Sequence, residues 1–342
     1  MTWFAKREPV KGEEMTAGQI GVTDLAADDG GGAGEPKKLK GGKRALDGGW
    51  KTAFPFLLPS LLGFLIFYLI PTIRAIRISF TTDSLTSRNP AEWVGTENYA
   101  DLWSDDRFWD SVVVTLKFVA LNIGTQTVLA LILAVMMDRL TRSLIVRGIL
   151  LVPWVLPNVL VAMLWLFLLD PRVGFVNTVI EGLGFNASAF LNDKSLVVPA
   201  MAFINTWKFT GYTALLLFAG MQTIPRNLYE AGALDGSTEM KMFRTITLPL
   251  LKPVLALVLV VSLIGSFQMF DVAQTASGGL GGETGGPSGA SRVIYIYIYE
   301  NAFLFRNKFG YAAAMATVLM GFLMMVTLVQ LRLLRADESD LA

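Results

Sequence analysis

The sequence predicts an all-α membrane protein with six transmembrane helices and a disordered N-terminal tail. Of its 342 residues, 53% are hydrophobic and only 17% are charged, whereas soluble domains carry about one quarter charged residues. Uncharged apolar runs long enough to cross a bilayer, which takes about 20 residues, recur along the chain after residue 50. Residues 1–50 instead alternate glycine-rich, basic and acidic clusters, with too few apolar side chains to build a core.

The composition excludes several classes of function. The chain has neither cysteine nor histidine, which removes disulfides, thiolate nucleophiles and the commonest general base and metal ligand. We therefore expect no catalytic residue and no metal site. A net charge of +1 gives no basis for nucleic-acid binding. No G-x-x-x-x-G-K-[S/T] loop occurs, and the glycines between 276 and 291 do not fit a G-x-G-x-x-G register, so the chain has no nucleotide-binding loop of its own.

Six runs are predicted to cross the bilayer. The second is expected to extend outward to about Phe108, and the polar and aromatic stretch 77–107 is expected to form an external loop with short helices. The fourth is interrupted only by Lys208, and an intramembrane charge usually faces a water-filled cavity or a partner. The predicted spans are Thr52 to Ile73, Phe118 to Met137, Gly148 to Leu169, Ser195 to Pro225, Pro253 to Phe270 and Phe309 to Leu331.

The distribution of Lys and Arg sets the predicted orientation, because short basic segments stay in the cytoplasm. Basic residues at 37–51, 139–147, 226–252 and 332–335 all fall on one side of the membrane if the N-terminus is inside. The opposite loops also carry several arginines, so the bias is real but not large. We expect both termini to be cytoplasmic, with 1–50 and 332–342 as tails.

A polar island at 222–252 separates the fourth and fifth spans. We expect a helix with Pro225 in its first turn, ending at Asp235-Gly236, where glycine takes the left-handed conformation. A second short helix is expected from an N-cap at Ser237 to Leu248-Pro249, with Pro253 opening the next helix. A DNA-binding helix-turn-helix has this outline, but the island lacks a strongly basic face and lies between membrane-length segments. An amphipathic connector that packs on its own neighbours is the remaining structural alternative.

The island carries the most specific motif. The run Glu230-Ala-Gly-Ala-Leu-Asp235-Gly236, followed by Phe243, Ile246 and Leu248-Pro249, closely resembles the EAA loop of type I ABC importer permeases. More narrowly, it resembles that of the carbohydrate subfamily typified by the maltose permease subunit. The sequence departs from the family at Gly232, where alanine is usual, and a glycine there weakens a helix by about 1 kcal/mol.

The resemblance continues outside the island. Leu57-Leu-Pro59, Phe67 to Phe80 and Trp93 to Trp109 are similar to the first helix and the following loop of such permeases, and Phe267 to Asp271 is similar to the end of their fifth helix. This implies the type I ABC transporter permease fold. The implied parts are a first transmembrane helix with an external loop at 51–109, the ABC transmembrane type-1 domain at 110–331, and the cytoplasmic EAA coupling loop at 222–252.

The resemblance also implies a division of labour in a bacterial-type cytoplasmic membrane. Two homologous permease subunits form the pathway, two ABC ATPase subunits bind ATP and Mg, and an external solute-binding protein delivers a carbohydrate. This chain then needs no cofactor of its own and is not an enzyme. The residues implied to couple to the ATPase are Leu228, Tyr229, Glu230, Ala231, Gly232, Asp235, Gly236, Phe243, Ile246, Leu248 and Pro249.

Substrate contacts are implied on the fourth and fifth spans, where aromatic rings and hydroxyls suit a sugar. Each has a structural alternative: Lys208 can snorkel or pack against Asp271, and Ser262 and Ser266 can serve helix packing. The implied residues are Trp207, Lys208, Phe209, Tyr212, Ser262, Ser266, Gln268 and Met269.

Two other functions stay open at this point. The first is a permease of the same class for another solute such as glycerol phosphate, whose anion Lys208 would meet. The second is a stand-alone secondary transporter or channel, which would need coupling carboxylates within the spans, where only Asp271 approaches that requirement.

Overall fold

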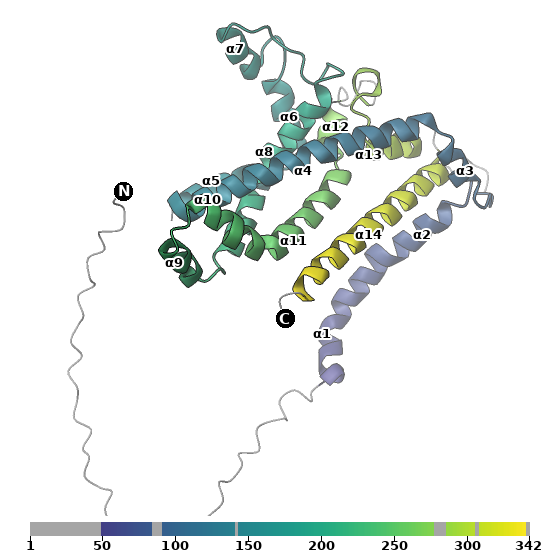
Figure 1. Ribbon diagram of the computed structural model, residues 1–342. Coiled ribbons are helices and arrows are strands. Elements are labelled where there is room, and N and C mark those ends of the chain that lie inside the picture. Colours follow the sequence, from purple (N-terminus) through teal and green to yellow (C-terminus); the bar gives the residue numbers. More distant parts are fainter. Residues whose placement is uncertain (1–48, 84–90, 141–142, 277–284, 305–307, 340–342) are drawn as a thin grey trace, which may run out of the picture. The chain divides into compact units, whose positions relative to one another are not determined.

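The computed structural model describes residues 49–83, 91–140, 143–276, 285–304 and 308–339 (Figure 1). The chain divides into two units, residues 1–62 and residues 63–342. In the first unit the described residues belong to α1 (Gly49–Phe64), whose side chains from Phe54 onward are exposed. The predicted disordered tail at 1–50 lies outside the described residues, apart from its last two positions.

The first predicted span is confirmed as a continuous helical stretch. A helix from Phe54 to Ile78 is long and apolar enough to cross a bilayer. It passes from α1 through a π turn at Leu65–Leu69 into α2 (Ile70–Ile78), which packs on the C-terminal helix α14 (Phe309–Ser339).

Two π turns allow helices to run through prolines. The turn at Leu65–Leu69 precedes Ile70-Pro71, and the Ile70 N–H donates to the Leu65 carbonyl. A second turn at Phe243–Thr247 precedes Leu248-Pro249, and the Leu248 N–H donates to the Phe243 carbonyl in the same way. Proline has no N–H and its ring crowds the carbonyl four residues earlier, and the wider π turn relieves both constraints.

The second π turn corrects a prediction from the sequence. The helix expected to end at Leu248-Pro249 continues directly into α11 (Leu248–Phe267), and Pro253 lies inside that helix instead of opening a new one. The fifth span is therefore part of a longer stretch from Glu239 to Thr275.

Four helical stretches among the described residues are long and apolar enough to cross a bilayer, or five if one bent pair counts as a span. Besides the two already described, they include α4 (Asp106–Leu140) and the apolar part of α14, Phe309–Gln330. The second and sixth predicted spans are confirmed. The helix α14 continues to Ser339, beyond the predicted end of the sixth span at Leu331.

The third predicted span is not one straight helix. It consists of α5 (Leu144–Val155) and α6 (Asn158–Leu168), which meet at an angle of 93°. Leu156 precedes Pro157 and takes an extended conformation, as a residue before proline favours. An uncharged run of this length therefore does not by itself specify a continuous helix.

The fourth predicted span is α8 (Val197–Met221), with 25 residues and therefore roughly 37 Å long. It is not among the stretches apolar enough to pass as a span, because polar residues such as Asn205, Thr206 and Lys208 interrupt it. Most of its side chains are buried on all sides, as expected of the central helix of a bundle. Figure 1 shows α4 running along α8, with α11 packed on both.

Short helices connect these long ones. The external stretch predicted at 77–107 contains one of them, α3, together with an isolated bridge between Thr81 and Trp93. The short elements are α3 (Glu97–Trp103), α7 (Phe175–Gly182), α9 (Arg226–Leu234), α10 (Glu239–Met242), α12 (Asp271–Ala276), η4 (Pro287–Gly289), α13 (Ile294–Tyr299) and η5 (Glu300–Leu304).

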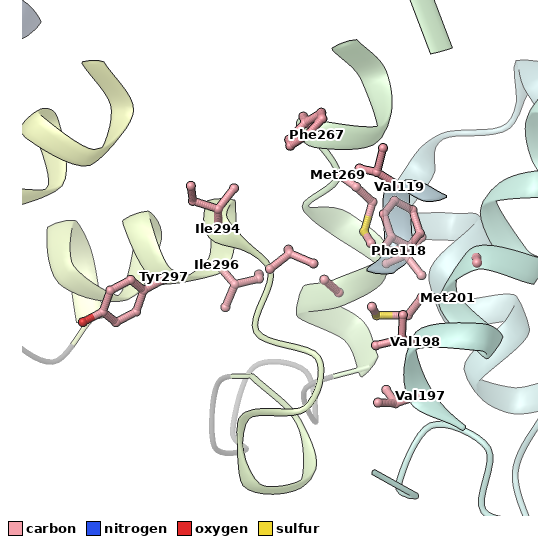
Figure 2. Packing of buried hydrophobic residues seen from close by; sticks show 14 of the residues in the cluster. Phe118, Val119, Val197, Val198, Met201, Phe267, Met269, Ile294, Ile296 and Tyr297 are labelled. Carbon is pink, nitrogen blue, oxygen red and sulfur yellow. The ribbon is translucent and has the colours of Figure 1, made fainter. Parts of the chain in front are cut away.

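The larger hydrophobic core joins segments that are distant in the sequence. Figure 2 shows Phe118 of α4, Met201 of α8 and Met269, which follows α11, facing one another. Ile294, Ile296 and Tyr297 bring α13 into the same cluster. A second cluster, built around Ala134, Leu217 and Leu251, joins α4, α8 and α11 nearer the polar island.

Gly211 lets α5 approach α8 closely. A Cβ atom at Gly211 would lie only 1.9 Å from the Leu150 carbonyl oxygen of α5. That oxygen belongs to backbone, so it cannot move aside as a side-chain tip would. The absence of a side chain at this position therefore determines how α5 packs on the bundle.

Asp105 ties three helices together at the start of α4. Its Oδ2 accepts hydrogen bonds from the hydroxyls of Tyr297 (2.5 Å) and Tyr311 (2.7 Å), and its Oδ1 accepts from the Arg107 N–H (3.0 Å). Burial by itself would raise the pKa of Asp105, but these hydrogen bonds outweigh it and lower the pKa. The charged carboxylate is thus the form that joins α13 and α14 to α4.

We predict that Gly211→Ala destabilises the protein by about 1–3 kcal/mol, because the new methyl group overpacks the contact with Leu150. Gly124→Ala is the matched control: a Cβ there has nothing within 4 Å, and alanine favours a helix over glycine. Thermal unfolding of the purified protein in detergent measures both. An unchanged midpoint for Gly211→Ala would contradict the predicted close packing.

We also predict that Asp105→Asn lowers the unfolding midpoint at about pH 7 and that this difference shrinks progressively as the pH falls below about 4, the usual pKa of an aspartate. A carboxyl with a lowered native pKa stabilises the fold above its unfolded pKa, and this contribution disappears as the pH falls through the native pKa. The exposed Asp110→Asn is the control. A midpoint difference that stays the same in acid would show that Asp105 does not act through its charge.

Candidate functional site

A cavity of about 240 Å³ lies between α4, α5, α8 and α11. Its wall combines aromatic rings with neutral amides and hydroxyls, and Trp154 and Tyr212 stack at 4.6 Å with an interplanar angle of 6°. The lining residues are Gln126, Trp154, Asn205, Phe209, Tyr212, Thr213, Leu216, Val258, Val261, Ser262, Gly265 and Ser266.

A second cavity of about 70 Å³ adjoins the first, and both are lined by Asn205, Phe209 and Gly265. This smaller cavity is the more polar of the two, because it contains one cation and one carboxylate, Lys208 and Asp271. The remaining lining residues are Asn158, Val161, Ile204, Gln268, Met269, Phe270 and Val272.

Lys208 is held at the kink between α5 and α6. The residue is only 5% exposed, and its Nζ donates a hydrogen bond to Oδ1 of Asn158, the first residue of α6. The ammonium also lies 5.3 Å from the centre of the Phe209 ring, a favourable cation–π arrangement. Lys208 therefore lines a cavity that also contains Asp271, and its contact with a solute stays a prediction.

The structure brings together most of the substrate residues expected from the sequence. Phe209, Tyr212, Ser262 and Ser266 line the larger cavity, and Lys208, Phe209, Gln268 and Met269 line the smaller one. Trp207 lines neither cavity and packs edge-to-face on Trp165 at 5.5 Å. Trp207 does not reach the cavity that Lys208 lines, because the side chains of adjacent residues on a helix point about 100° apart.

Sequence reasoning missed several lining residues. Gln126, like Asn122, is an amide inside a run that is mostly apolar, and that exception was a readable signal. Asn158 carried the same kind of signal inside the third predicted span, and the bend between α5 and α6 places it opposite Lys208. Trp154 gave no signal, because an aromatic residue in an apolar run does not show which helix it faces.

The polar island has the predicted helix, glycine turn and helix. Gly236 has a φ of +71°, the Ser237 N–H donates to the Gly232 carbonyl (2.9 Å), and the Gly236 N–H donates to the Ala233 carbonyl (3.1 Å). This hydrogen-bond pair is the Schellman motif that ends many helices. The predicted stop of α9 at Asp235-Gly236 is confirmed.

The caps differ from the prediction by one residue each. Pro225 is the N-cap of α9 rather than a residue of its first turn. Thr238, not Ser237, caps α10, and its Oγ1 accepts from the Lys241 N–H at 3.4 Å. The N–H of Ser237 is already used by the glycine turn, so the chain takes one more residue before the next helix begins.

One side of the island is anchored to the bundle. The Tyr229 hydroxyl hydrogen-bonds Thr247 Oγ1 (2.8 Å). Arg139, near the end of α4, forms an ion pair with Glu239, and Gln222 donates to Asp138 (2.6 Å). The last two contacts attach the start of the island, Gln222, and the start of α10, Glu239, to the end of α4, and the first holds α9 on the π turn at Phe243–Thr247.

The packing around Gly232 explains why this position has a glycine where the family usually has alanine. A Cβ there would lie 3.3 Å from Ile246 Cδ1 and 3.3 Å from Met242 Sδ. The glycine thus allows α9 to pack closely on the second helix of the island, which compensates for its low helix propensity. Both neighbouring atoms are side-chain ends, which can shift by a few tenths of an ångström.

Several side chains of the island are exposed to solvent in the part of the chain that the structure describes. Leu228 is 40% exposed and Leu234, which the sequence analysis did not select, is 90% exposed. The residues expected to couple therefore separate into two groups. Glu230, Ala231, Asp235, Gly236 and Pro249 are exposed like Leu228, whereas Tyr229, Gly232, Phe243, Ile246 and Leu248 are half-buried.

The geometry of the two cavities suits binding and movement of a solute rather than catalysis. Within the residues the structure describes, no group of three or more His, Cys, Asp or Glu side chains is placed to hold a metal ion. The cavities instead offer neutral hydrogen-bonding groups beside aromatic rings, which is how proteins bind polyhydroxy compounds.

Comparison with known proteins gives consistent results. Residues 126–336 match the family described as "Binding-protein-dependent transport system inner membrane component". The sulfoquinovosyl glycerol transport system permease protein of Agrobacterium fabrum is 33% identical over 81% of this chain and 88% of its own length. The trehalose/maltose transport system permease protein of Thermococcus litoralis is 32% identical over 81% of this chain and 90% of its own length.

The fold also has a solved counterpart. A chain of a bacterial ABC transporter involved in the import of alginate superposes with a TM-score of 0.72. The match covers 84% of this chain and 96% of that chain at 24% sequence identity. A likeness at this level of identity establishes the type I permease fold expected from the sequence.

We predict that Gly232→Ala is tolerated and that Gly232→Val disrupts the island. The gain in helix propensity of about 1 kcal/mol offsets the small shifts of Met242 and Ile246 needed for a methyl group, whereas a branched side chain would require larger shifts of both. Limited proteolysis of the purified protein between α9 and α10 measures the effect. Equal protection of the two variants would contradict the inferred packing around Gly232.

Proposed function

The chain belongs to the family of binding-protein-dependent transport system inner membrane components and is a permease subunit of an ABC transporter; from this premise we propose that it forms half of an import pathway for a sugar or oligosaccharide. The observation that carries the proposal is the 240 Å³ cavity, whose wall of aromatic, amide and hydroxyl groups suits a neutral polyhydroxy solute. We assign solute contacts to Lys208, Phe209, Tyr212, Ser262, Ser266, Gln268 and Met269, and omit Trp207.

The subunit works with partners in this proposal. A second, homologous permease subunit completes the pathway, an external solute-binding protein delivers the solute, and two ABC ATPase subunits bind ATP and Mg and hydrolyse ATP. The absence of a phosphate-binding loop from the sequence supports this division. Because the chain belongs to this family, we set aside the hypothesis of a stand-alone secondary transporter or channel that the sequence left open.

The exposed side of the polar island docks to the ATPase. Leu228, Ala231 and Leu234 follow one another at intervals of three along α9 and are exposed, so they present an apolar strip beside Glu230 and Asp235. Because the island is cytoplasmic in this arrangement, both chain termini are cytoplasmic too. The basic residues that border the island support that orientation.

The proposed organisation follows from these assignments. The first transmembrane helix and external loop occupy 51–109, the transport domain occupies 110–331 with the coupling loop at 222–252, and the ends of the chain form cytoplasmic segments. The family match at 126–336 supports the position of the transport domain.

A second candidate substrate has a specific observation in its favour. Lys208 is a buried cation in the smaller cavity, and the sn-glycerol-3-phosphate transport system permease protein of Yersinia pestis is 31% identical over 81% of this chain and 92% of its own length. Asp271 in the same cavity opposes an anion, so we place the neutral sugar first. Competition of labelled maltose uptake by glycerol phosphate separates the two.

We predict that Gly236→Val and Glu230→Lys reduce ATP-driven uptake by at least about tenfold while membrane insertion stays normal. Valine cannot take the left-handed conformation of Gly236 without strain, and lysine reverses the charge at the docking face. Co-purification of the ATPase and uptake in proteoliposomes measure the effect, with Glu181→Lys, the same charge reversal at an exposed position of α7 outside the island, as control. Normal ATPase binding and normal uptake in both variants would rule out the docking role.

A further inference from the structure

Polar side chains from α4, α8 and α11 meet beside the larger cavity and hydrogen-bond one another. The two residues of α4 and the two of α11 are each four apart and so share one face of their helix, whereas α8 contributes two adjacent residues and a third one two turns later. The set, called here the amide cluster, consists of Asn122 and Gln126 of α4, Asn205, Thr206 and Thr213 of α8, and Ser262 and Ser266 of α11.

Asn122 is the centre of the amide cluster. Its Nδ2 donates to Ser266 Oγ (2.9 Å) and Gln126 Oε1 (3.3 Å). Its Oδ1 accepts from Asn205 Nδ2 (3.1 Å) and Thr206 Oγ1 (3.2 Å). An asparagine side chain has two N–H donors and two oxygen lone pairs, so Asn122 uses its full hydrogen-bonding capacity.

Gln126 continues the cluster toward the cavity. Its Oε1 accepts from Asn122, so its Nε2 is the group that donates, to Thr213 Oγ1 (2.8 Å) and Ser262 Oγ (3.3 Å). The Asn122 amide thereby decides which end of the Gln126 amide points to which helix.

Asn122 itself does not line the cavity. It is 0% exposed, whereas three of its four partners, Gln126, Asn205 and Ser266, line the cavity wall. A residue in this place can influence a solute only by fixing the directions in which the lining groups donate and accept.

We infer that Asn122 is a positioning residue that determines solute selectivity by orienting the amides and hydroxyls of the cavity wall. The inference rests on the proposed function, because it assumes that the solute occupies this cavity. It extends that proposal to a residue on α4, which the sequence did not place near the solute.

The physical reason is the cost of a buried polar group without a partner. When Asn122 is intact, the Asn205 amide, the Gln126 carbonyl and the Ser266 hydroxyl are all satisfied in a single arrangement. When its amide is removed, the Asn205 amide and the Gln126 carbonyl must turn toward the cavity or toward another partner, whereas Ser266 loses one incoming hydrogen bond and keeps its own bond to the Ser262 carbonyl (2.7 Å). The pattern of donors and acceptors that a solute meets then changes, although no atom in contact with the solute has been replaced.

The alternative is that the amide cluster only holds the helices together, as interhelical hydrogen bonds in membranes do. That role would lower stability and reduce transport of every solute in the same proportion. A positioning role instead changes the ratio between solutes. The two roles therefore differ in a measurable quantity.

The test uses the complete transporter, with its partner permease, ATPase and binding protein, in proteoliposomes. Maltose and glycerol phosphate serve as probes for wild type, Asn122→Leu and Asn122→Ser, because serine keeps a hydroxyl in place should leucine prevent folding. Ser111→Ala is the matched control: Ser111 is buried on the same helix and bonds only within it. We expect the ratio of the half-saturating concentrations of the two probes to change about tenfold, the equivalent of roughly one hydrogen bond, in the Asn122 variants and not in the control.

An unchanged ratio, with uptake of both probes reduced equally, would overturn the inference. If wild type takes up neither probe, the proposed substrate class fails, and the inference is then decided by a reporter that needs no solute. The chain contains no cysteine, so Leu216→Cys puts a single thiol in the cavity wall. A shift in its labelling rate by a water-soluble thiol reagent on adding Asn122→Leu supports the positioning role, and an identical rate refutes it.

Discussion

The need to pair the amide, hydroxyl and ammonium groups in the middle of α8 is the constraint on which this structure depends. The hydrocarbon interior of a bilayer contains no water to satisfy an amide or an ammonium, yet α8 carries Asn205, Thr206 and Lys208 near its middle. The bundle meets this need by surrounding α8 with α4, α5 and α11. Lys208 is satisfied by Asn158, and Asn205 and Thr206 are satisfied by Asn122. The same groups that stabilise the bundle therefore form the wall of a polar cavity.

Interruptions in the helices make room for that cavity. The bend at Leu156-Pro157 turns α6 away from the line of α5 and places Asn158 opposite Lys208. The close contact of Gly211 with Leu150 then holds α5 against α8, so that Trp154 can stack on Tyr212. Glycine and proline thus act here through the shape they give to the bundle, because neither contributes a functional group to the cavity.

The cavity and the polar island are built on the same helices. The helix α8 carries Phe209 and Tyr212 in the cavity wall and ends at Met221, just before the island. The helix α11 continues from the π turn of the island to Ser262 and Ser266 in the opposite wall. The ion pair of Arg139 with Glu239 links the end of α4 to the same island. With an ATPase docked as proposed, a displacement of the island would move three walls of the cavity, α4, α8 and α11, at once.

The sequence by itself determined the fold class, the positions of the long helices and the glycine turn of the island, because each depends on local chemistry: apolar runs of bilayer length, and a left-handed residue at Gly236. It did not determine that the run at 148–169 bends at Pro157, or that the helices pass through Pro71 and Pro249 on π turns, since a proline permits more than one local outcome. Only the tertiary structure placed Gln126, Trp154 and Asn158 around one cavity and turned Trp207 away from it. Those positions depend on which helix faces pack together, and packing between segments distant in the chain leaves no periodic signal in either segment alone.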